Sequence, residues 1–210
     1  MKKNIPTTTL FLDVGGVLLT NGWDHHARKR AAKHFKLNWA DMQERHELNF
    51  EIQEEDKITF QEYLDRVIFW QKRPFTRAEF RQFMFAQSKP FTEMIELVRN
   101  LKAKYKLKVF VVSNEAREVN AYRIRQFKLD GFVDAFISSC FVQLRKPDAD
   151  IFRLALDVAQ VPTRQIVYIE NTPLFVQIAE GFGIRSILHT DCKSTAEKLA
   201  AWGLQSGVIQ

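Results

Sequence analysis

The chain has 210 residues, of which 46% are hydrophobic and 27% are charged, a balance that is typical of folded globular proteins and excludes extensive disorder. This length suits one core domain with a modest insertion and is too short for two full domains. The formal net charge is +6, but lysine and arginine are spread along the chain without a dense basic run, so we expect no nucleic-acid partner. The two cysteines, Cys140 and Cys192, match no disulfide or zinc spacing, and we expect reduced thiols.

The hydrophobic segments are too short to cross a membrane. No segment reaches the roughly 18 uninterrupted apolar residues that a membrane-spanning helix needs. The apolar stretch from Leu10 to Leu19 is interrupted by Asp13, and no clear cleavage site follows it, which argues against a secretory leader. We therefore expect a cytoplasmic protein without a membrane partner.

Short apolar segments alternate with helical patterns along most of the chain. Strands are predicted at residues 8–14, 107–112, 135–138, 166–169 and 185–188. Helices are predicted at residues 116–128, 148–159, 173–181 and 194–202. This alternation predicts an α/β fold in which helices cover both faces of a parallel sheet.

The stretch between the first two strands, roughly residues 23–104, is helical in character and contains no strong strand pattern. Three pairs match the capping box that starts a helix, two of them in this stretch: Thr59 with Glu62, Thr76 with Glu79, and Ser194 with Glu197. Aromatic residues are concentrated in the same stretch: Trp23, Trp39, Phe50, Phe60, Phe69, Trp70, Phe80 and Phe83. We expect most of them to fill the core of a small helical bundle and a few to line a lid over the site.

Polar residues stand at the points where the predicted strands end. They are Asp13 before Gly15 and Gly16, Ser113 with Asn114, Glu170 with Asn171, and Lys146 in a loop before a helix. Because ligands bind beyond the carboxyl ends of parallel strands, we expect the fold to bring these residues together.

These residue types suit chemistry on a phosphate ester. A carboxylate such as Asp13 can attack phosphorus and split hydrolysis into two easier steps. Mg²⁺ bound by Asp13 and Glu170 would offset the repulsion between that carboxylate and the phosphate. Lys146 would neutralise the developing charge as a point cation, while Ser113 and the backbone of Asn114 would donate hydrogen bonds to phosphate oxygens.

The order of these motifs resembles that of the haloacid dehalogenase superfamily of phosphatases and related hydrolases. Four segments carry the resemblance over nearly the whole chain: residues 11–18 (FLDVGGVL), 111–114 (VVSN), 146–148 (KPD) and 167–172 (VYIENT). The resemblance implies that Asp13 is the nucleophile, that Lys146 is the lysine of the third motif, and that Ser113 and Asn114 bind phosphate. It implies a Mg²⁺ site formed by Asp13, the backbone carbonyl of Gly15, Glu170 and Asn171.

The same resemblance implies a Rossmann-like core and a helical cap that selects the substrate. We expect the core to comprise residues 1–19 and 91–210, and the cap residues 20–90. The implied function is a Mg²⁺-dependent phosphatase of small phosphorylated metabolites that works through an aspartyl-phosphate on Asp13. The sequence makes no prediction of the particular substrate or of the oligomeric state.

Two positions depart from the usual pattern of the superfamily. Gly15 stands where metal-dependent phosphatases carry a general acid and base, whose loss typically costs about 10²–10⁴-fold in rate. Asn171 replaces the second aspartate of the fourth motif. Gly15 therefore predicts weak turnover and a longer-lived phosphoaspartate, unless water or Glu115 acts as the base.

Two other functions are compatible with these departures. One is a metal-independent 2-haloacid dehalogenase-type hydrolase in which Asp13 attacks carbon, which suits Gly15 but leaves less use for the charge of Glu170. The other is a degenerate, non-catalytic protein that binds a phosphorylated ligand. For Arg117, Arg123 and Arg145, a solvated helix face is favoured over a role in steering anions.

Overall fold

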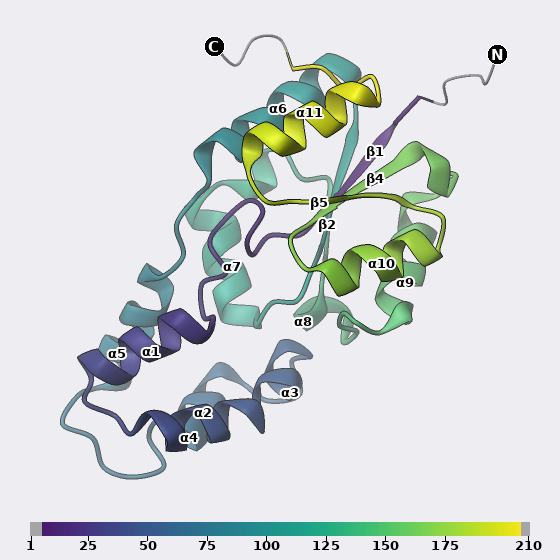
Figure 1. Ribbon diagram of the computed structural model, residues 1–210. Helices are drawn as coiled ribbons and strands as arrows, with labels where there is room; N and C mark the ends of the chain where they lie inside the picture. Colours follow the sequence, from purple (N-terminus) through teal and green to yellow (C-terminus); the bar gives the residue numbers. More distant parts are fainter. Residues whose placement is uncertain (1–5, 207–210) are drawn as a thin grey trace.

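The computed structural model describes residues 6–206 and contains a five-stranded parallel sheet in the order β3-β2-β1-β4-β5 (Figure 1). The strands are β1 (Thr9–Leu12), β2 (Lys108–Ser113), β3 (Ala135–Ser138), β4 (Ile166–Glu170) and β5 (Arg185–Leu188). In the middle of the sheet, Phe11 of β1 lies between Phe110 of β2 and Tyr168 of β4. The predicted α/β, Rossmann-like fold is confirmed, and each predicted strand is present.

Helices cover both faces of the sheet (Figure 1). The elements that follow the helical stretch are α6 (Thr92–Tyr105), α7 (Arg117–Gln126), η1 (Leu129–Gly131), α8 (Ser139–Val142), α9 (Ala149–Ala159), η2 (Thr163–Gln165), α10 (Pro173–Gly181) and α11 (Cys192–Ala201). Helices α6 and α11 pack against the face that carries Leu12 and Val111. Helices α9 and α10 pack against the other face, which carries Phe11 and Val112. Strand β1 is buried along its whole length because both of its faces are covered.

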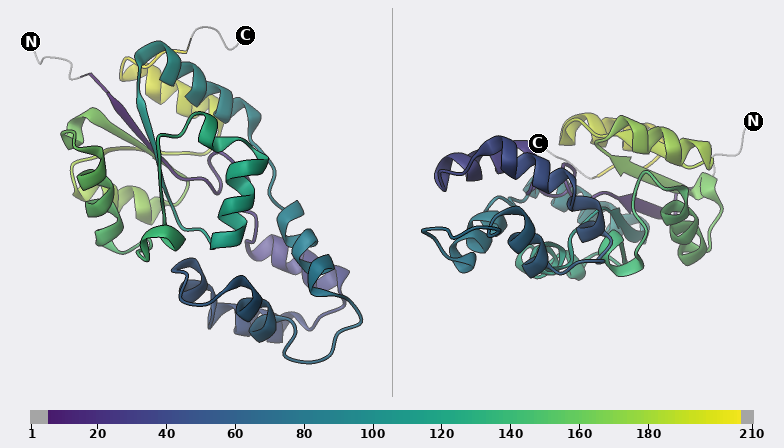
Figure 2. Two further views of the ribbon diagram at one scale, coloured as in Figure 1. Left: turned by 180° about the vertical axis from the view of Figure 1, so that it is seen from behind. Right: turned by 90° about the horizontal axis from the view of Figure 1, so that it is seen from below.

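Five helices form between β1 and α6. They are α1 (His25–His34), α2 (Trp39–Glu47), α3 (Phe50–Glu54), α4 (Phe60–Val67) and α5 (Arg77–Ala86), and they lie together beside the sheet (Figure 2). Thr59 and Thr76 cap α4 and α5 in the predicted capping boxes. The predicted capping box at Ser194 is wrong, because α11 begins earlier and Asp191 is its N-cap, with Asp191 Oδ1 accepting from Ser194 N at 2.8 Å.

We refer to residues 20–90 as the helical insertion. As expected, most of its aromatic side chains fill its own core, and Tyr63 and Phe80 are completely buried. The two ends of the insertion lie side by side: Thr20 N donates to Lys89 O, and Phe91 N donates to Leu18 O, each at 2.9 Å. These contacts join the two ends of the insertion next to the end of β1 and the start of α6.

The structure also bears on the two cysteines and on the lengths of the helices. Cys140 and Cys192 are both free. Within residues 6–206 no helix combines the length and apolar character needed to span a membrane; the longest, α6, has 14 residues.

Candidate active site

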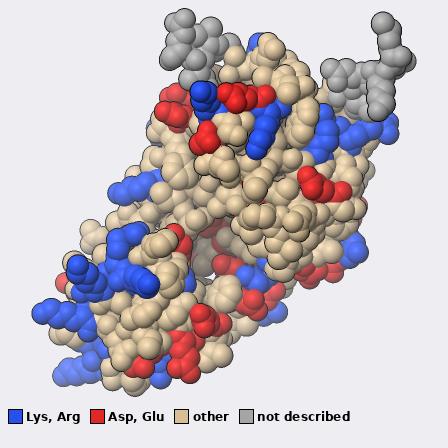
Figure 3. Space-filling view, in the orientation of Figure 1, with Lys and Arg blue, Asp and Glu red and all other residues tan. Residues whose placement is uncertain are grey.

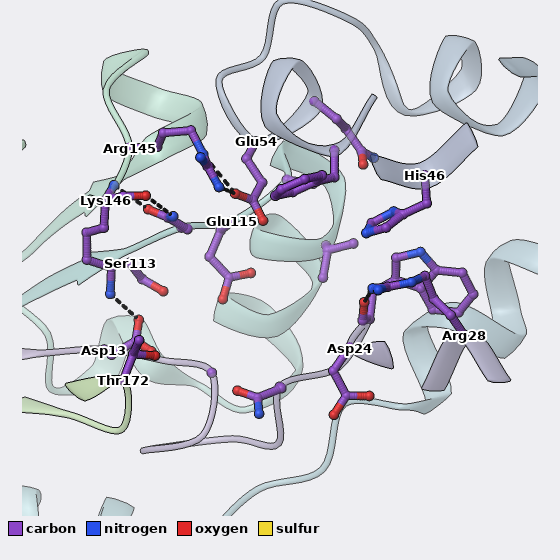
Figure 4. Close-up of a pocket in the computed structure, with 18 of the residues that line it drawn as sticks. Asp13, Asp24, Arg28, His46, Glu54, Ser113, Glu115, Arg145, Lys146 and Thr172 are labelled. Atoms are coloured by element: carbon purple, nitrogen blue, oxygen red, sulfur yellow. Dashed lines mark hydrogen bonds and ion pairs between the residues drawn. The ribbon is translucent and has the colours of Figure 1, made fainter. Parts of the chain in front are cut away.

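The carboxyl ends of β1, β2 and β4 meet at one edge of the sheet and bring their polar residues together (Figure 4). Asp13 directly follows β1, Ser113 is the last residue of β2, and Glu170 is the last residue of β4. The backbone N–H of Asp13 donates to Ile169 O at 3.0 Å, which fixes Asp13 beside the end of β4. All three side chains are buried, so any charge on them needs a partner inside the protein.

The ammonium group of Lys146 supplies that partner. Its Nζ atom donates to Glu170 Oε2 at 2.6 Å, to Asp13 Oδ1 at 3.0 Å and to Tyr168 OH at 3.2 Å. These contacts use all three N–H groups of a side chain that is only 1% exposed. The Tyr168 hydroxyl in turn donates to Glu170 Oε2 at 2.5 Å. A buried cation is tolerated in such a position because every one of its protons has an acceptor.

Burial and charge act in opposite directions on the protonation of this group. Burial raises the pKa of Asp13 to about 6; Lys146 lowers it, and Glu170 raises it further. Burial alone would lower the pKa of Lys146, but the carboxylates of Asp13 and Glu170 raise it above its ordinary value. Near neutral pH, Asp13 is therefore mainly ionised and Lys146 is protonated.

Tyr168 has no predicted role, yet it completes the shell around Lys146. Its position carries a signal in the sequence, because residues two apart on a strand point to the same face, and Tyr168 stands two residues before Glu170. Burial, together with the charges of Glu170 and Asp13, raises the pKa of Tyr168 well above its ordinary value, so its hydroxyl stays a donor.

The side chain of Asn114 positions the loop that carries Lys146. Asn114 Nδ2 donates to Lys146 O, and Lys146 N donates to Asn114 Oδ1, both at 2.8 Å. These two hydrogen bonds involve the side-chain amide of Asn114. They do not involve its backbone N–H, which is the group predicted to bind phosphate. Ser113 lies beside Asp13 in the wall of the same pocket (Figure 4).

The side-chain amide of Asn171 lies between Glu170 and Gly15. With its nitrogen turned towards them, it donates to Glu170 Oε1 at 3.0 Å and to the carbonyl oxygen of Gly15 at 3.1 Å. Neighbouring ligand oxygens of an octahedral Mg²⁺ are about 3 Å apart, because each lies roughly 2.0–2.1 Å from the metal. Rotated by half a turn, the amide would instead present its oxygen beside these two oxygens, which is the orientation that a bound cation would need.

The chemistry of these donors also fits Mg²⁺, which binds carboxylate and carbonyl oxygens. Residues 6–206 contain no cluster of three or more His, Cys, Asp or Glu side chains that could hold a metal. A metal here would therefore need the oxygens of Gly15 and Asn171 in addition to the carboxylates of Asp13 and Glu170. Gly16 keeps this corner open: its φ is +79°, and a Cβ atom there would lie 2.2 Å from Asn171 Nδ2.

Beside Gly15 the pocket wall holds an ion pair. A Cβ atom on Gly15 would lie 3.3 Å from Asn21 Oδ1 and 4.0 Å from Arg123 Nη1. Arg123 donates to Glu115 Oε1 at 2.5 Å and to Ser88 Oγ at 3.0 Å, and its side chain is only 3% exposed. The expected solvated position of Arg123 is therefore wrong, because its guanidinium reaches inward to the buried Glu115.

The other two arginines tie the helical insertion to the core. Arg145 pairs with Glu51 and Glu54 of α3, at 2.9 Å in each case, and Arg117 pairs with Asp56 at 2.7 Å. The expected solvated position is thus wrong for Arg145, because its side chain is only 14% exposed. The side chain of Arg117 is 45% exposed, which agrees with the expected solvated position. These pairs hold α3 against the edge of the sheet where the site lies.

A pocket of about 480 Å³ lies between the strand ends and the helical insertion, and Figure 3 shows the hollow between the two parts with acidic side chains near its rim. Its size is that of a typical small-molecule site. Six of the seven predicted site residues line it: Asp13, Gly15, Ser113, Asn114, Lys146 and Asn171. Glu170 lies behind Lys146 and does not reach the pocket surface. From the insertion, Arg28, His46 and Gln53 line the opposite wall, and no motif in the sequence indicated them.

Comparison with solved structures shows the same fold in other proteins. An HAD family enzyme from Bacteroides thetaiotaomicron is 19% identical with a TM-score of 0.73, and the match covers 89% of this chain and 95% of that chain. The wild-type form of that enzyme, in complex with magnesium and inorganic phosphate, is 20% identical with a TM-score of 0.72 over 88% of this chain and 94% of that one. An L-2-haloacid dehalogenase from Xanthobacter autotrophicus is 14% identical with a TM-score of 0.62, over 94% of this chain and 84% of that one. Identities this low establish the fold alone.

Sequence comparison identifies the family. A protein of Caldanaerobacter subterraneus subsp. tengcongensis, designated a candidate pyrophosphatase PpaX, is 25% identical over 100 residues, which is 46% of this chain and 46% of that protein. The match thus spans about half the length of this curated relative. Residues 7–183 match the family described as haloacid dehalogenase-like hydrolase, and this range includes every predicted site residue. The chain therefore belongs to the haloacid dehalogenase-like hydrolase family.

Proposed function

We propose that the protein is a Mg²⁺-dependent phosphatase of small phosphorylated metabolites that acts through an aspartyl-phosphate on Asp13. The contact between Asp13 and Lys146 at the bottom of the pocket carries this proposal. Lys146 Nζ donates to Asp13 Oδ1 at 3.0 Å, and the neighbouring Ser113 hydroxyl, like Lys146, lowers the pKa of this carboxyl group. A carboxylate held in this way at the pocket wall is oriented for attack on a ligand in the pocket.

In the first step, Asp13 Oδ2 forms a bond to phosphorus, and the bond from phosphorus to the ester oxygen breaks. The alcohol leaves with a proton taken from water, since Gly15 provides no acid. Lys146, and the donors Ser113 and Asn114 N–H, stabilise negative charge on the transferring group. In the second step, water attacks the same phosphorus, which releases inorganic phosphate and restores the Asp13 carboxylate.

The residues that would hold Mg²⁺ are Asp13, Gly15 through its carbonyl, Glu170 and Asn171. When bound, the ion would offset the repulsion between the Asp13 carboxylate and the phosphate. Two comparisons support this reading: the relative from Bacteroides thetaiotaomicron has been crystallised with magnesium and inorganic phosphate, and the relative from Caldanaerobacter is designated a candidate pyrophosphatase.

Replacement of the nucleophile tests the proposal. We expect Asp13→Asn to abolish Mg²⁺-dependent hydrolysis of 4-nitrophenyl phosphate, because the amide cannot attack phosphorus, while the thermal unfolding transition stays cooperative. Asp150→Asn is the matched control, since Asp150 is exposed and forms a surface pair with Arg153. Mass spectrometry of quenched wild-type enzyme should show a phosphoryl group on the peptide that contains Asp13. Full activity of Asp13→Asn would contradict the mechanism.

The two alternative functions give different results in the same assays. Dehalogenase chemistry at Asp13 would release chloride from 2-chloropropionate and would survive treatment with a chelator. A non-catalytic protein would bind inorganic phosphate with Mg²⁺ and turn over no phosphate ester. The acidic Glu170, which shares Lys146 Nζ with Asp13, supports the phosphatase over the dehalogenase, because a metal-free site has less use for its charge.

A further inference from the structure

The wall of the pocket opposite Asp13 carries three polar side chains from the helical insertion, and much of their hydrogen-bonding capacity is unused. They are Arg28 of α1, His46 of α2 and Gln53 of α3. Figure 4 shows Arg28 and His46 on the side of the pocket facing Asp13 and Lys146. Each of these residues is more than nine-tenths buried, and each lines the pocket.

Arg28 is a buried cation without a carboxylate partner among residues 6–206. Its Nε donates to Gln43 Oε1 at 3.0 Å, and its Nη1 donates to Trp23 O at 2.7 Å. These bonds use two of its five N–H groups and leave both N–H groups of Nη2 unused. They also fix the plane of the guanidinium, so its free edge is held in one orientation for a ligand.

His46 is fixed as a neutral donor by a relay of hydrogen bonds. The indole N–H of Trp23 can only donate, so Tyr63 OH, 2.8 Å away, accepts from it. The hydrogen of the Tyr63 hydroxyl has no other acceptor among the described residues than His46 Nδ1, at 2.8 Å. His46 Nδ1 therefore accepts, and the ring proton lies on Nε2, which has no partner within residues 6–206. Burial lowers the pKa of His46 to about 3, so the ring is neutral near physiological pH.

Gln53 adds an amide whose capacity is also unused. Its side chain is 6% exposed, and its Nε2 atom is buried without a hydrogen-bond partner in the described part of the chain. A buried amide N–H without an acceptor is unfavourable, and a ligand oxygen is one group that can satisfy it once the side chain turns towards the pocket.

Arg28 differs from the other cations that line the pocket, because each of those contacts a carboxylate. Arg123, Arg145 and Lys146 are each ion-paired, with Glu115, Glu54 and Asp13 respectively. Two further acids line the pocket, and both already bind donors: Asp24 Oδ1 accepts from Ala27 N at 2.7 Å, and Glu47 Oε1 accepts from Gln43 Nε2 at 2.8 Å. Of the four cations in this lining, Arg28 is thus the one without direct contact to a carboxylate.

We propose that Arg28, His46 and Gln53 form a second substrate subsite, which binds an anionic group, a carboxylate or a phosphate, at the end of the substrate remote from the scissile ester. All three present N–H groups without acceptors, and an oxyanion is the ligand that accepts from several donors at once. The substrate class is then a small phosphate monoester with a second anionic group. This inference rests on the proposed function, which assigns the scissile ester to Asp13.

A matched pair of aryl phosphates tests the subsite. The probes are 4-carboxyphenyl phosphate and its methyl ester, which has similar size but lacks the second charge. We expect the wild-type ratio of kcat/KM, acid over ester, to exceed that of Arg28→Gln by about tenfold or more. The two leaving groups differ in reactivity, but this difference affects the acid-to-ester ratio equally in wild-type protein and in each variant, so it cancels when the ratios are compared. Arg28→Lys should retain part of the preference, and 1,4-phenylene bisphosphate shows whether a phosphate replaces the carboxylate.

Arg30→Gln is the control variant, because Arg30 lies on the same helix but is exposed, bonds to Gln87 and does not line the pocket. It should keep the wild-type ratio. If Arg28→Gln fails to fold, as judged by thermal unfolding, Gln53→Leu provides an independent test and should lower the ratio about threefold. An unchanged ratio in a folded variant would overturn the subsite.

A binding assay separates failure of the subsite from failure of the proposed function. Calorimetric titration with 4-carboxybenzylphosphonate and its methyl ester, in the presence of Mg²⁺, requires no turnover. If neither aryl phosphate is hydrolysed but the acid binds more tightly than the ester in an Arg28-dependent way, the subsite stands and the phosphatase assignment falls. If both are hydrolysed without an Arg28-dependent preference, the subsite falls and the phosphatase assignment stands.

Discussion

The ammonium of Lys146 donates to Glu170 Oε2 across 2.6 Å, and neither side chain has appreciable contact with solvent. Lys146 comes from the loop before α9 and Glu170 from the end of β4, so the contact fixes the position of the loop relative to the sheet. Because the same Nζ atom also binds Asp13, it separates two buried carboxylates that would otherwise repel each other.

Removal of this cation should destabilise the protein strongly. We expect Lys146→Met to lower the free energy of unfolding by about 3–5 kcal/mol, because it leaves Asp13 and Glu170 as unpaired buried charges. Urea denaturation at slightly alkaline pH measures the effect. Lys102→Met is the matched control: Lys102 forms a partly exposed pair with Asp134 and should cost about 0–1 kcal/mol. Equal losses in the two variants would contradict the structural role of Lys146.

Restoration of an acid at position 15 should increase turnover. The backbone at Gly15 is not in the left-handed region, and only the flexible Asn21 side chain would crowd a new Cβ atom. We expect kcat of Gly15→Asp to exceed that of Gly15→Ala by about tenfold, less than the 10²–10⁴-fold of a well-placed acid, because Arg123 would pair with the new carboxylate. The alanine variant controls for the added Cβ. A kcat equal to or below that of the alanine variant would show that the missing acid does not limit the rate.

Asn171 should determine the affinity for Mg²⁺. If the amide turns its oxygen to a bound Mg²⁺, Asn171→Ala should raise the half-saturating Mg²⁺ concentration about tenfold. Asn171→Asp should lower that concentration, because a carboxylate binds the ion more strongly than an amide. The measurements are initial rates and the Mg²⁺-induced rise in melting temperature. A wild-type titration curve for Asn171→Ala would indicate that the amide only donates hydrogen bonds.

The buried His46 should make stability depend on pH. Its pKa is lowered from 6.5 to about 3 in the folded protein, so below pH 6.5 the unfolded chain binds a proton that the native protein does not. Stability is therefore lost as pH falls from 6.5 towards 3, by at most about 1.4 kcal/mol per pH unit from this group. His46→Gln should show a shallower decline when urea denaturation is compared at pH 6.5 and about pH 4.5.

His26→Gln is the control for that comparison, because His26 is exposed on α1. It should follow the wild-type decline. Parallel curves for wild-type protein and His46→Gln would mean that His46 takes up its proton without loss of the fold.

Much of the site could be predicted from the chain because its parts belong to local patterns. A charged residue that closes an apolar strand before two glycines identifies Asp13, and Ser113 and Glu170 follow their strands in the same way. The parallel order of the sheet then requires these ends to meet at one edge. Tyr168 could have been found by the same reasoning, from its spacing to Glu170 on β4.

The helices of the insertion could be predicted from the sequence, but the side chains with which they line the pocket could not. Arg28, His46 and Gln53 lie on three helices, and no spacing along the chain relates them to each other or to Asp13. Arg123 illustrates the same difficulty. Its sequence neighbours on α7 suggest a polar, solvated helix, whereas in the structure it lies against Glu115 in the interior.

The parallel sheet, the helical character of residues 20–90 and the chemistry expected of Asp13 could be read from the chain, because strand and helix periods and strand-end residues are local signals. The pairing of charges, the direction of the Lys146 side chain and the place of Arg28 in the pocket wall follow from the folded arrangement alone. These features depend on contacts between segments far apart in the chain, where burial and the geometry of hydrogen bonds, rather than residue type, set the role of each side chain.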